Sequence, residues 1–81
     1  MITPAQCRAA RALIEWSQEQ LAHASQLGLS TIRYFEKGYR VPTRSNREAI
    51  QKALEAAGVV FIAENGGGAG VRLARPKGSA E

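Results

Sequence analysis

The chain has 81 residues, of which 44% are hydrophobic, and a net charge of +4, so it forms one small domain without room for a deep catalytic cleft. One cysteine and one histidine give neither an internal disulfide nor a zinc site, and we predict no metal and no cofactor. No apolar run approaches the roughly 20 residues of a transmembrane helix, and Met-Ile-Thr-Pro-Ala-Gln is not a signal peptide, so we expect a cytoplasmic protein without a membrane partner.

The first expected helix begins at Thr3-Pro4-Ala5-Gln6. Thr3 is the capping residue, Pro4 takes the first helical position, and Gln6 stands three residues after the cap. We expect it to end at about Glu15. Leu13 and Trp16 are expected to flank the buried face of this helix, and Trp16 to cover the core at the helix end. One buried face follows helical spacing and comprises Cys7, Ala10, Arg11 and Ile14. Cys7 is expected to be a buried structural thiol.

The segment from Ser17 to Gly38 predicts two short helices joined by a tight turn. Ser17 and Gln20 form a capping box for the first, and the residues expected to face inward are Leu21, Ala22 and Ala24. Gly28 is expected to cap the second helix, and Gly38 to end it in a left-handed conformation.

The second of these helices has two different faces. Helical spacing places Ile32, Phe35 and Glu36 on one side; the opposite side carries Ser30, Arg33, Tyr34 and Lys37. A bracing helix followed by a polar, basic helix is the arrangement of a helix-turn-helix.

Positive charge is concentrated around this second helix. The residues from 33 to 47 include one acid, Glu36, and five cations: Arg33, Lys37, Arg40, Arg44 and Arg47. This excess predicts contacts with the phosphates of nucleic acid, and the alternative is a solvated charged surface without a partner.

A loop is expected over residues 39–43, because proline disfavours a helical residue before it. Ser45 and Glu48 predict the capping box of a further helix, which Gly58 would end. Its apolar face comprises Ala49, Ile50, Ala53, Leu54 and Ala57.

The last quarter predicts a β-hairpin with strands over residues 59–62 and 71–75. Residues 64–70 have turn composition, and the triglycine lacks the Gly-Lys-Ser/Thr ending of a phosphate loop. A lone hairpin is marginal in water, so it packs on the helices or pairs with a second copy. We favour pairing, with a dimer interface formed by Val59, Val60, Phe61, Ile62, Val71 and Leu73. The expected organisation is a helical domain over residues 1–58, the hairpin over 59–75 and a disordered tail over 76–81.

Two segments resemble the Cro/C1-type, or Xre-family, helix-turn-helix regulators of bacteria: Trp16-Ser17-Gln18-Glu19-Gln20-Leu21-Ala22 and Ser30-Thr31-Ile32-Arg33-Tyr34-Phe35-Glu36-Lys37-Gly38. The resemblance covers roughly residues 7–58. It implies a mainly α, lambda-repressor-like bundle of four or five helices, to which the C-terminal β-hairpin is added.

The resemblance also implies roles for individual residues. Gln18 would touch a phosphate and support a base-contacting side chain, and Thr31 would contact a phosphate or pack. Base edges would be reached by Leu29, Ser30, Arg33 and Tyr34, although partial burial is an equal alternative for Leu29. The DNA backbone would be held by Lys37, Tyr39, Arg40 and Arg44. Arg11 would pair with Glu36.

The chain departs from the family pattern in the turn of the helix-turn-helix. Gln26 stands where the family usually has glycine, and Gly28 stands where it usually has serine or threonine. Gln26 must therefore adopt a left-handed backbone at some cost, or the turn has another shape.

These observations favour a sequence-specific transcriptional regulator, a repressor that binds double-stranded DNA as a homodimer on a pseudo-palindromic site. The alternative is an antitoxin or anti-activator that binds a protein partner through the hairpin or a helix face. We predict no enzymatic activity, because the single histidine, His23, is expected on an exposed face without a partner for catalysis.

Overall fold

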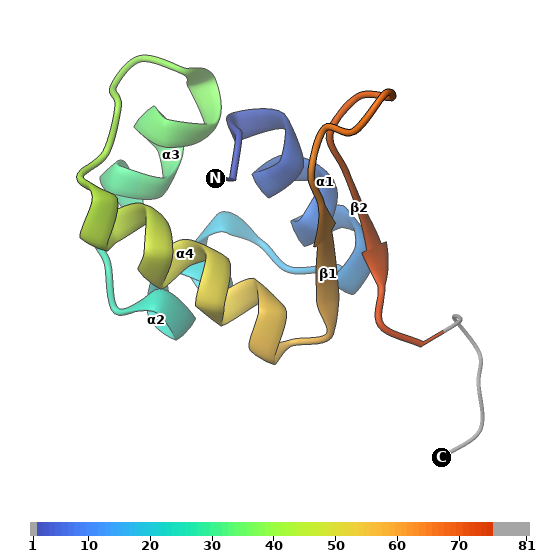
Figure 1. The fold of residues 1–81 in the computed structure, drawn as a ribbon. Coiled ribbons are helices and arrows are strands. Elements are labelled where there is room, and N and C mark those ends of the chain that lie inside the picture. Colours follow the sequence, from blue (N-terminus) through green and yellow to red (C-terminus); the bar gives the residue numbers. More distant parts are fainter. Residues whose placement is uncertain (1, 76–81) are drawn as a thin grey trace.

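The computed structural model describes residues 2–75; the expected tail over 76–81 lies outside the described residues. Four helices are followed by a two-stranded antiparallel hairpin, which confirms the expected mainly α, lambda-repressor-like fold (Figure 1). In chain order the elements are α1 (Pro4–Ile14), α2 (Gln18–Ser25), α3 (Leu29–Lys37), α4 (Arg44–Ala56), β1 (Val59–Ile62) and β2 (Gly70–Leu73).

Capping boxes begin the first two helices, as the sequence predicts. The Thr3 hydroxyl accepts from the Gln6 backbone N–H at 3.1 Å, and the Gln6 side-chain oxygen accepts from the Thr3 N–H at 2.9 Å. Ser17 and Gln20 repeat this arrangement at the start of α2. Each box satisfies backbone donors that a helix start leaves without partners, so both helix starts are fixed locally.

The start of α4 corrects the expectation for Ser45. Thr43 is the N-cap, and its hydroxyl accepts from the Asn46 N–H at 3.1 Å. Thr43 has an extended backbone directly after Pro42 and is itself a good capping residue, so the helix begins two residues earlier than predicted and Ser45 lies within its first turn.

The inward face of α2 also differs from the expectation. Ala24 is exposed, and Ser25 is buried in its place. The Ser25 hydroxyl donates to the Leu21 carbonyl at 2.8 Å, which satisfies a polar group that would otherwise be costly to bury. A serine that bonds its own helix in this way has no distinctive sequence pattern.

The core contains side chains from every helix and from β1. Its largest fully buried members are Leu21, Ile32, Ile50, Leu54 and Cys7. Trp16 packs against this core while remaining partly exposed, in agreement with its expected place after α1.

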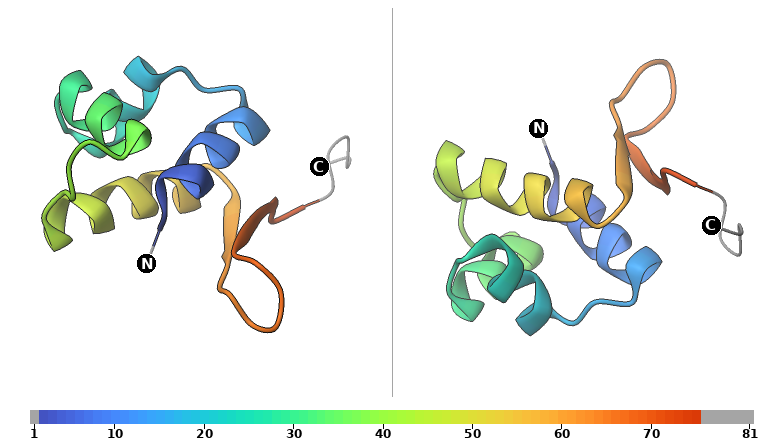
Figure 2. Two further views of the ribbon diagram at one scale, coloured as in Figure 1. Left: turned by 90° about the horizontal axis from the view of Figure 1, so that it is seen from above. Right: turned by 90° about the horizontal axis from the view of Figure 1, so that it is seen from below.

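The hairpin pairs Val59 with Leu73 and Ile62 with Gly70, so β2 begins and ends earlier than the expected 71–75. Because side chains alternate along a strand, Val59, Phe61 and Val71 face the helices, and Val60, Ile62 and Arg72 face outward. The hairpin packs on α1 and α4, on the side of the molecule away from α2 and α3 (Figure 2).

The hairpin therefore packs on its own helices, which is the less favoured of the two arrangements that the sequence allows. It also changes the place of Val59, which is 2% exposed and belongs to the core of its own chain. A buried Val59 cannot offer its side chain to a second copy. The apolar side chains of the outward face are Val60 and Ile62, and Ile62 is 41% exposed.

Candidate nucleic-acid interface

The outer face of α3 carries exposed polar side chains because its inner face is anchored in the core. Ile32 and Phe35 are buried, and the helical repeat then directs Ser30, Arg33 and Lys37 to solvent. Tyr34 is 42% exposed on the same side. The four side chains that the sequence placed on this face are therefore brought together on one accessible surface.

Leu29 and Thr31 lie at the borders of this surface. Both are half-buried, and Leu29 packs against the core. The partial-burial alternative for Leu29 thus holds, and only part of its side chain is left for a ligand.

The loop after α3 adds two cation–aromatic contacts. The Arg40 guanidinium lies 5.3 Å from the centre of the Tyr34 ring, and the Lys37 ammonium lies 5.7 Å from that of Tyr39. Such contacts hold a cation near an aromatic face at modest energetic gain. Here they hold the charges of Lys37 and Arg40 beside α3. Tyr39 itself is 70% exposed.

The two arginines at the start of α4 differ. The Arg44 side chain is 79% exposed and has its Nε 3.5 Å from a Glu48 oxygen, one turn further along α4. Arg47 is half-buried, and its Nε is buried without a hydrogen-bond partner among the described residues. Arg33, Lys37, Arg40 and Arg44 are therefore the exposed cations of residues 33–47, and Arg47 is half-buried.

The buried carboxylate of Glu36 joins the three helices that position this surface. Arg11 binds both carboxylate oxygens, with Nε 2.7 Å from Oε2 and Nη2 2.8 Å from Oε1. The Cys7 thiol donates to Oε2 at 3.1 Å, and the Gln18 amide nitrogen donates to Oε1 at 3.0 Å. Arg8 donates to the backbone carbonyl of Glu36. The last turn of α3 is thus fixed to α1 and to the start of α2.

These contacts determine the ionisation of the cluster. Burial raises the pKa of Glu36, but the hydrogen bonds from Arg11, Cys7 and Gln18 and the charge of Arg11 together lower it below its ordinary value. Burial and the adjacent Glu36 carboxylate raise the pKa of the Cys7 thiol far above its ordinary value. Glu36 is therefore a carboxylate at neutral pH, and Cys7 is a protonated, 0% exposed thiol that matches the expected structural role.

Gln18 has a structural partner that its sequence position does not reveal. One N–H of its amide is used by Glu36, and an amide has a second N–H that can donate to a phosphate. Gln18 is half-buried at the first position of α2, close to the last turn of α3. Gln18 therefore supports the last turn of α3 through Glu36.

Gln26 adopts the left-handed backbone conformation in the turn between α2 and α3, the first of the two expected outcomes. Gln26 has φ 60° and ψ 37°, and its N–H donates to the His23 carbonyl at 3.2 Å. The N–H of Leu27 donates to Ala22 at 3.0 Å, which completes a Schellman-type ending of α2. His23 is exposed, as expected.

The fold and the exposed basic helix define a helix-turn-helix protein. A helix-turn-helix family model matches residues 8–57, more than half of the chain, so the protein belongs to the Cro/C1-type, or Xre, helix-turn-helix family. It is therefore a DNA-binding transcription regulator in the general sense of that family. A search of curated proteins found no match.

Two other properties of residues 2–75 bear on the site. None of the helices in this part of the chain has the length and apolar character needed to cross a bilayer. Within the same residues, no three histidine, cysteine, aspartate or glutamate side chains are grouped so that they could hold a metal ion.

Proposed function

We propose that this protein is a repressor that binds a pseudo-palindromic operator as a homodimer. The observation that carries the proposal is the exposed face of α3, where Ser30, Arg33 and Tyr34 stand beside Lys37, Arg40 and Arg44. A cationic border of this kind suits phosphates, and the central polar side chains suit base edges.

Within this surface, Arg33 is the residue we assign to base reading. It lies in the middle of the outer face of α3, and a guanidinium can donate two hydrogen bonds to the O6 and N7 atoms of guanine. Ser30 and Tyr34, on the same face, would contact neighbouring bases or phosphates. Lys37, Tyr39, Arg40 and Arg44 would set the register on the backbone without reading sequence.

Dimerisation is assigned to the hairpin, away from α3. The Ala74 N–H donates to the Gly58 carbonyl at 2.8 Å, so the alternation of an antiparallel ladder directs the backbone groups of Val71 and Leu73 away from β1. No backbone hydrogen bond within residues 2–75 uses these outward groups. An edge with free donors and acceptors can pair with the same edge of a second copy.

The experiment that tests this function is selection from random duplex DNA with the purified protein at two salt concentrations. We expect enrichment of a two-fold-symmetric motif with half-sites about one helical turn apart, and an affinity that falls steeply with salt. Enrichment of a single half-site would remove the dimer from the proposal. No enrichment at either salt concentration would remove sequence-specific binding.

A second candidate is an antitoxin or anti-activator that binds a protein through the outward face of the hairpin. It is supported by the exposure of Ile62 beside Val60 on that face. Deleting the hairpin is a poor test, because Val59 belongs to the core. The double variant Val60→Lys with Ile62→Lys instead changes only the outward face. Retained dimerisation and DNA binding, with loss of a heterologous partner, would favour this candidate.

A further inference from the structure

The side chain of Gln6 joins the start of α1 to the hairpin. Gln6 is 6% exposed, and its side-chain oxygen is used by Thr3 in the capping box of α1. This bond turns the amide back over the helix start and leaves its nitrogen directed toward the strands. That nitrogen donates to the Gly70 carbonyl at 2.9 Å and lies 3.4 Å from the Ile62 carbonyl.

The two carbonyls mark the loop end of the hairpin. Ile62 is the last residue of β1, Gly70 is the first of β2, and they are paired across the strands. The other end follows α4 directly through Gly58, which has φ 105° and accepts the hydrogen bond from Ala74. The hairpin is thus attached covalently at its base and by the Gln6 amide at its loop end.

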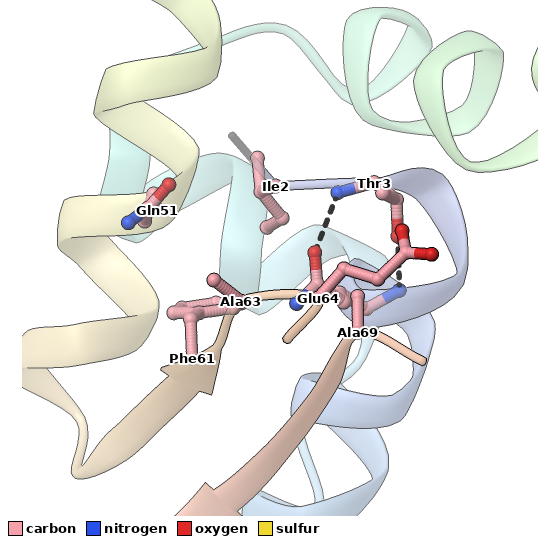
Figure 3. Close-up of a pocket in the computed structure, with 8 residues that line it drawn as sticks. Ile2, Thr3, Gln51, Phe61, Ala63, Glu64 and Ala69 are labelled. Atoms are coloured by element: carbon pink, nitrogen blue, oxygen red, sulfur yellow. Dashed lines mark hydrogen bonds between the residues drawn. The ribbon is translucent and has the colours of Figure 1, made fainter. Parts of the chain in front are cut away.

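The last strand pair has no side chain packed on the helices, because Ile62 faces outward and Gly70 has no side chain. A pocket of about 340 Å³ lies there, lined by Gln51 of α4, by Ile2, Thr3 and Gln6, and by the hairpin residues Phe61, Ala63, Glu64 and Ala69 (Figure 3). At the base, in contrast, Val59 is fully packed in the core. Phe61 and Val71 pack against the core one strand pair further in, so we assign the position of the loop end beyond that pair to the Gln6 hydrogen bonds.

The residues that follow Gln6 in the same helix fix α3. Cys7 and Arg11 hold the Glu36 carboxylate, and Arg8 holds the Glu36 carbonyl. The hairpin and the last turn of α3 are therefore both hydrogen-bonded to α1, within two turns of each other. The orientation of one relative to the other depends on α1 and on the Gln6 amide.

We propose that Gln6 is a positioning residue that sets the angle between the hairpin and α3, and so determines which half-site spacing the dimer accepts. This inference rests on the proposed dimerisation through the hairpin. Without the amide, the hairpin is held by its base and by the packing of Phe61 and Val71, and its loop end can shift relative to α1. A dimer formed by such hairpins would present its two α3 helices at a less defined separation.

The test is the Gln6→Met variant, which keeps the length of the side chain and removes its hydrogen bonds. Gln51→Met is the matched control, because it makes the same change on the α4 side of the pocket. Affinity is measured for a single half-site and for operators whose half-sites are moved by one or two base pairs from the selected spacing. We expect Gln6→Met to lower the preference for the selected spacing about fivefold, the scale of one net hydrogen bond, with unchanged half-site affinity. The control should keep the wild-type preference.

Hydrogen exchange provides a readout that does not depend on DNA. We expect the amides of Val60 and Arg72 to exchange about tenfold faster in Gln6→Met, while those of α2 and α3 keep their protection. An unchanged spacing preference or unchanged hairpin exchange in the folded variant would overturn the inference. If Gln6→Met does not fold, Gln6→Glu retains the acceptor for Thr3, removes the donor, and is measured in the same way.

A failure of the proposed dimer can be distinguished from a failure of the proposed role of Gln6. A wild-type protein that binds all spacings equally overturns the dimer and with it the role of Gln6 in spacing. Hydrogen exchange then still decides whether Gln6 fixes the hairpin on its own chain.

Discussion

Arg11 of α1 binds both carboxylate oxygens of Glu36 at the end of α3, at 2.7 and 2.8 Å. Glu36 is 2% exposed, while the Arg11 side chain is 19% exposed at the edge of the cluster. Arg11 also donates to the Trp16 carbonyl at 2.9 Å, where the chain leaves α1. One guanidinium therefore fixes the last turn of α3 and the connection to α2 together.

The first prediction concerns removal of this guanidinium. Arg11→Ala leaves the buried carboxylate without its cation, and breaking a buried pair in this way costs about 3 kcal/mol. In a domain of this size we expect the melting temperature to fall by at least about 10 °C. Arg33→Ala, on the exposed face of α3, is the control and should melt with the wild type. An unchanged melting temperature for Arg11→Ala would show that the pair contributes little.

The second prediction is a loss of stability in acid. The pKa of Glu36 is lower in the folded protein than its ordinary value of 4.5, so the unfolded chain binds this proton more readily. The contribution of Glu36 is therefore complete above pH 4.5 and is lost as the pH falls through the lower, folded pKa. Urea unfolding measured from pH 7 to pH 3 should show this loss in the wild type.

Glu36→Gln is the comparison for the acid measurement. It lacks the titrating group, so the difference in unfolding free energy between wild type and Glu36→Gln should shrink as the pH falls below 4.5. A constant difference across this range would mean that the folded pKa of Glu36 is not lowered.

The third prediction uses the left-handed Gln26. A residue with a Cβ pays a conformational cost at φ 60° that glycine does not pay, although glycine adds entropy to the unfolded chain. We expect Gln26→Gly to stabilise the fold by about 0.5 kcal/mol as measured by urea unfolding. Gln51→Gly, in the middle of α4, makes the same change at ordinary helical angles and should destabilise by about 1 kcal/mol. Equal destabilisation by both would mean that the turn carries no strain.

Local sequence signals predicted most of the fold. Capping residues, helical periodicity and the glycine at 38 identified α1, α2 and α3, because each signal acts within a few residues of the chain. The start of α4 was misplaced, since Thr43 and Ser45 are both capable caps and only the backbone after Pro42 decides between them.

The polar contacts between distant elements were less accessible to sequence reasoning. Gln6 was recognised as a capping residue, but its second partners lie 56 and 64 residues away. The charge pattern places Arg47 among the cations around α3, but it does not reveal that the Arg47 Nε is buried. In both cases a long polar side chain has several possible directions, and tertiary packing selects one. The hairpin strands were identified, but their alternation alone does not tell which face meets the helices.

The fourth prediction separates reading of bases from holding of phosphates. Arg33 stands in the middle of the outer face of α3, whereas Arg44 is at the border, at the start of α4. We expect Arg33→Ala to relax the preference at one base position of the selected motif, at a cost of about 1–3 kcal/mol for the best site. Arg44→Ala should weaken binding to all sequences and reduce the slope of log affinity against log salt by about one.

Both variants are measured on the selected operator and on operators with single base changes, across a range of salt concentrations. Lys52→Ala is a matched loss of one exposed positive charge from α4, outside the proposed surface, and should change neither specificity nor salt slope by a comparable amount. If Arg33→Ala keeps the wild-type base preference, another side chain of α3 reads the sequence. Ser30 and Tyr34 would then be the next to change, because they share that exposed face with Arg33.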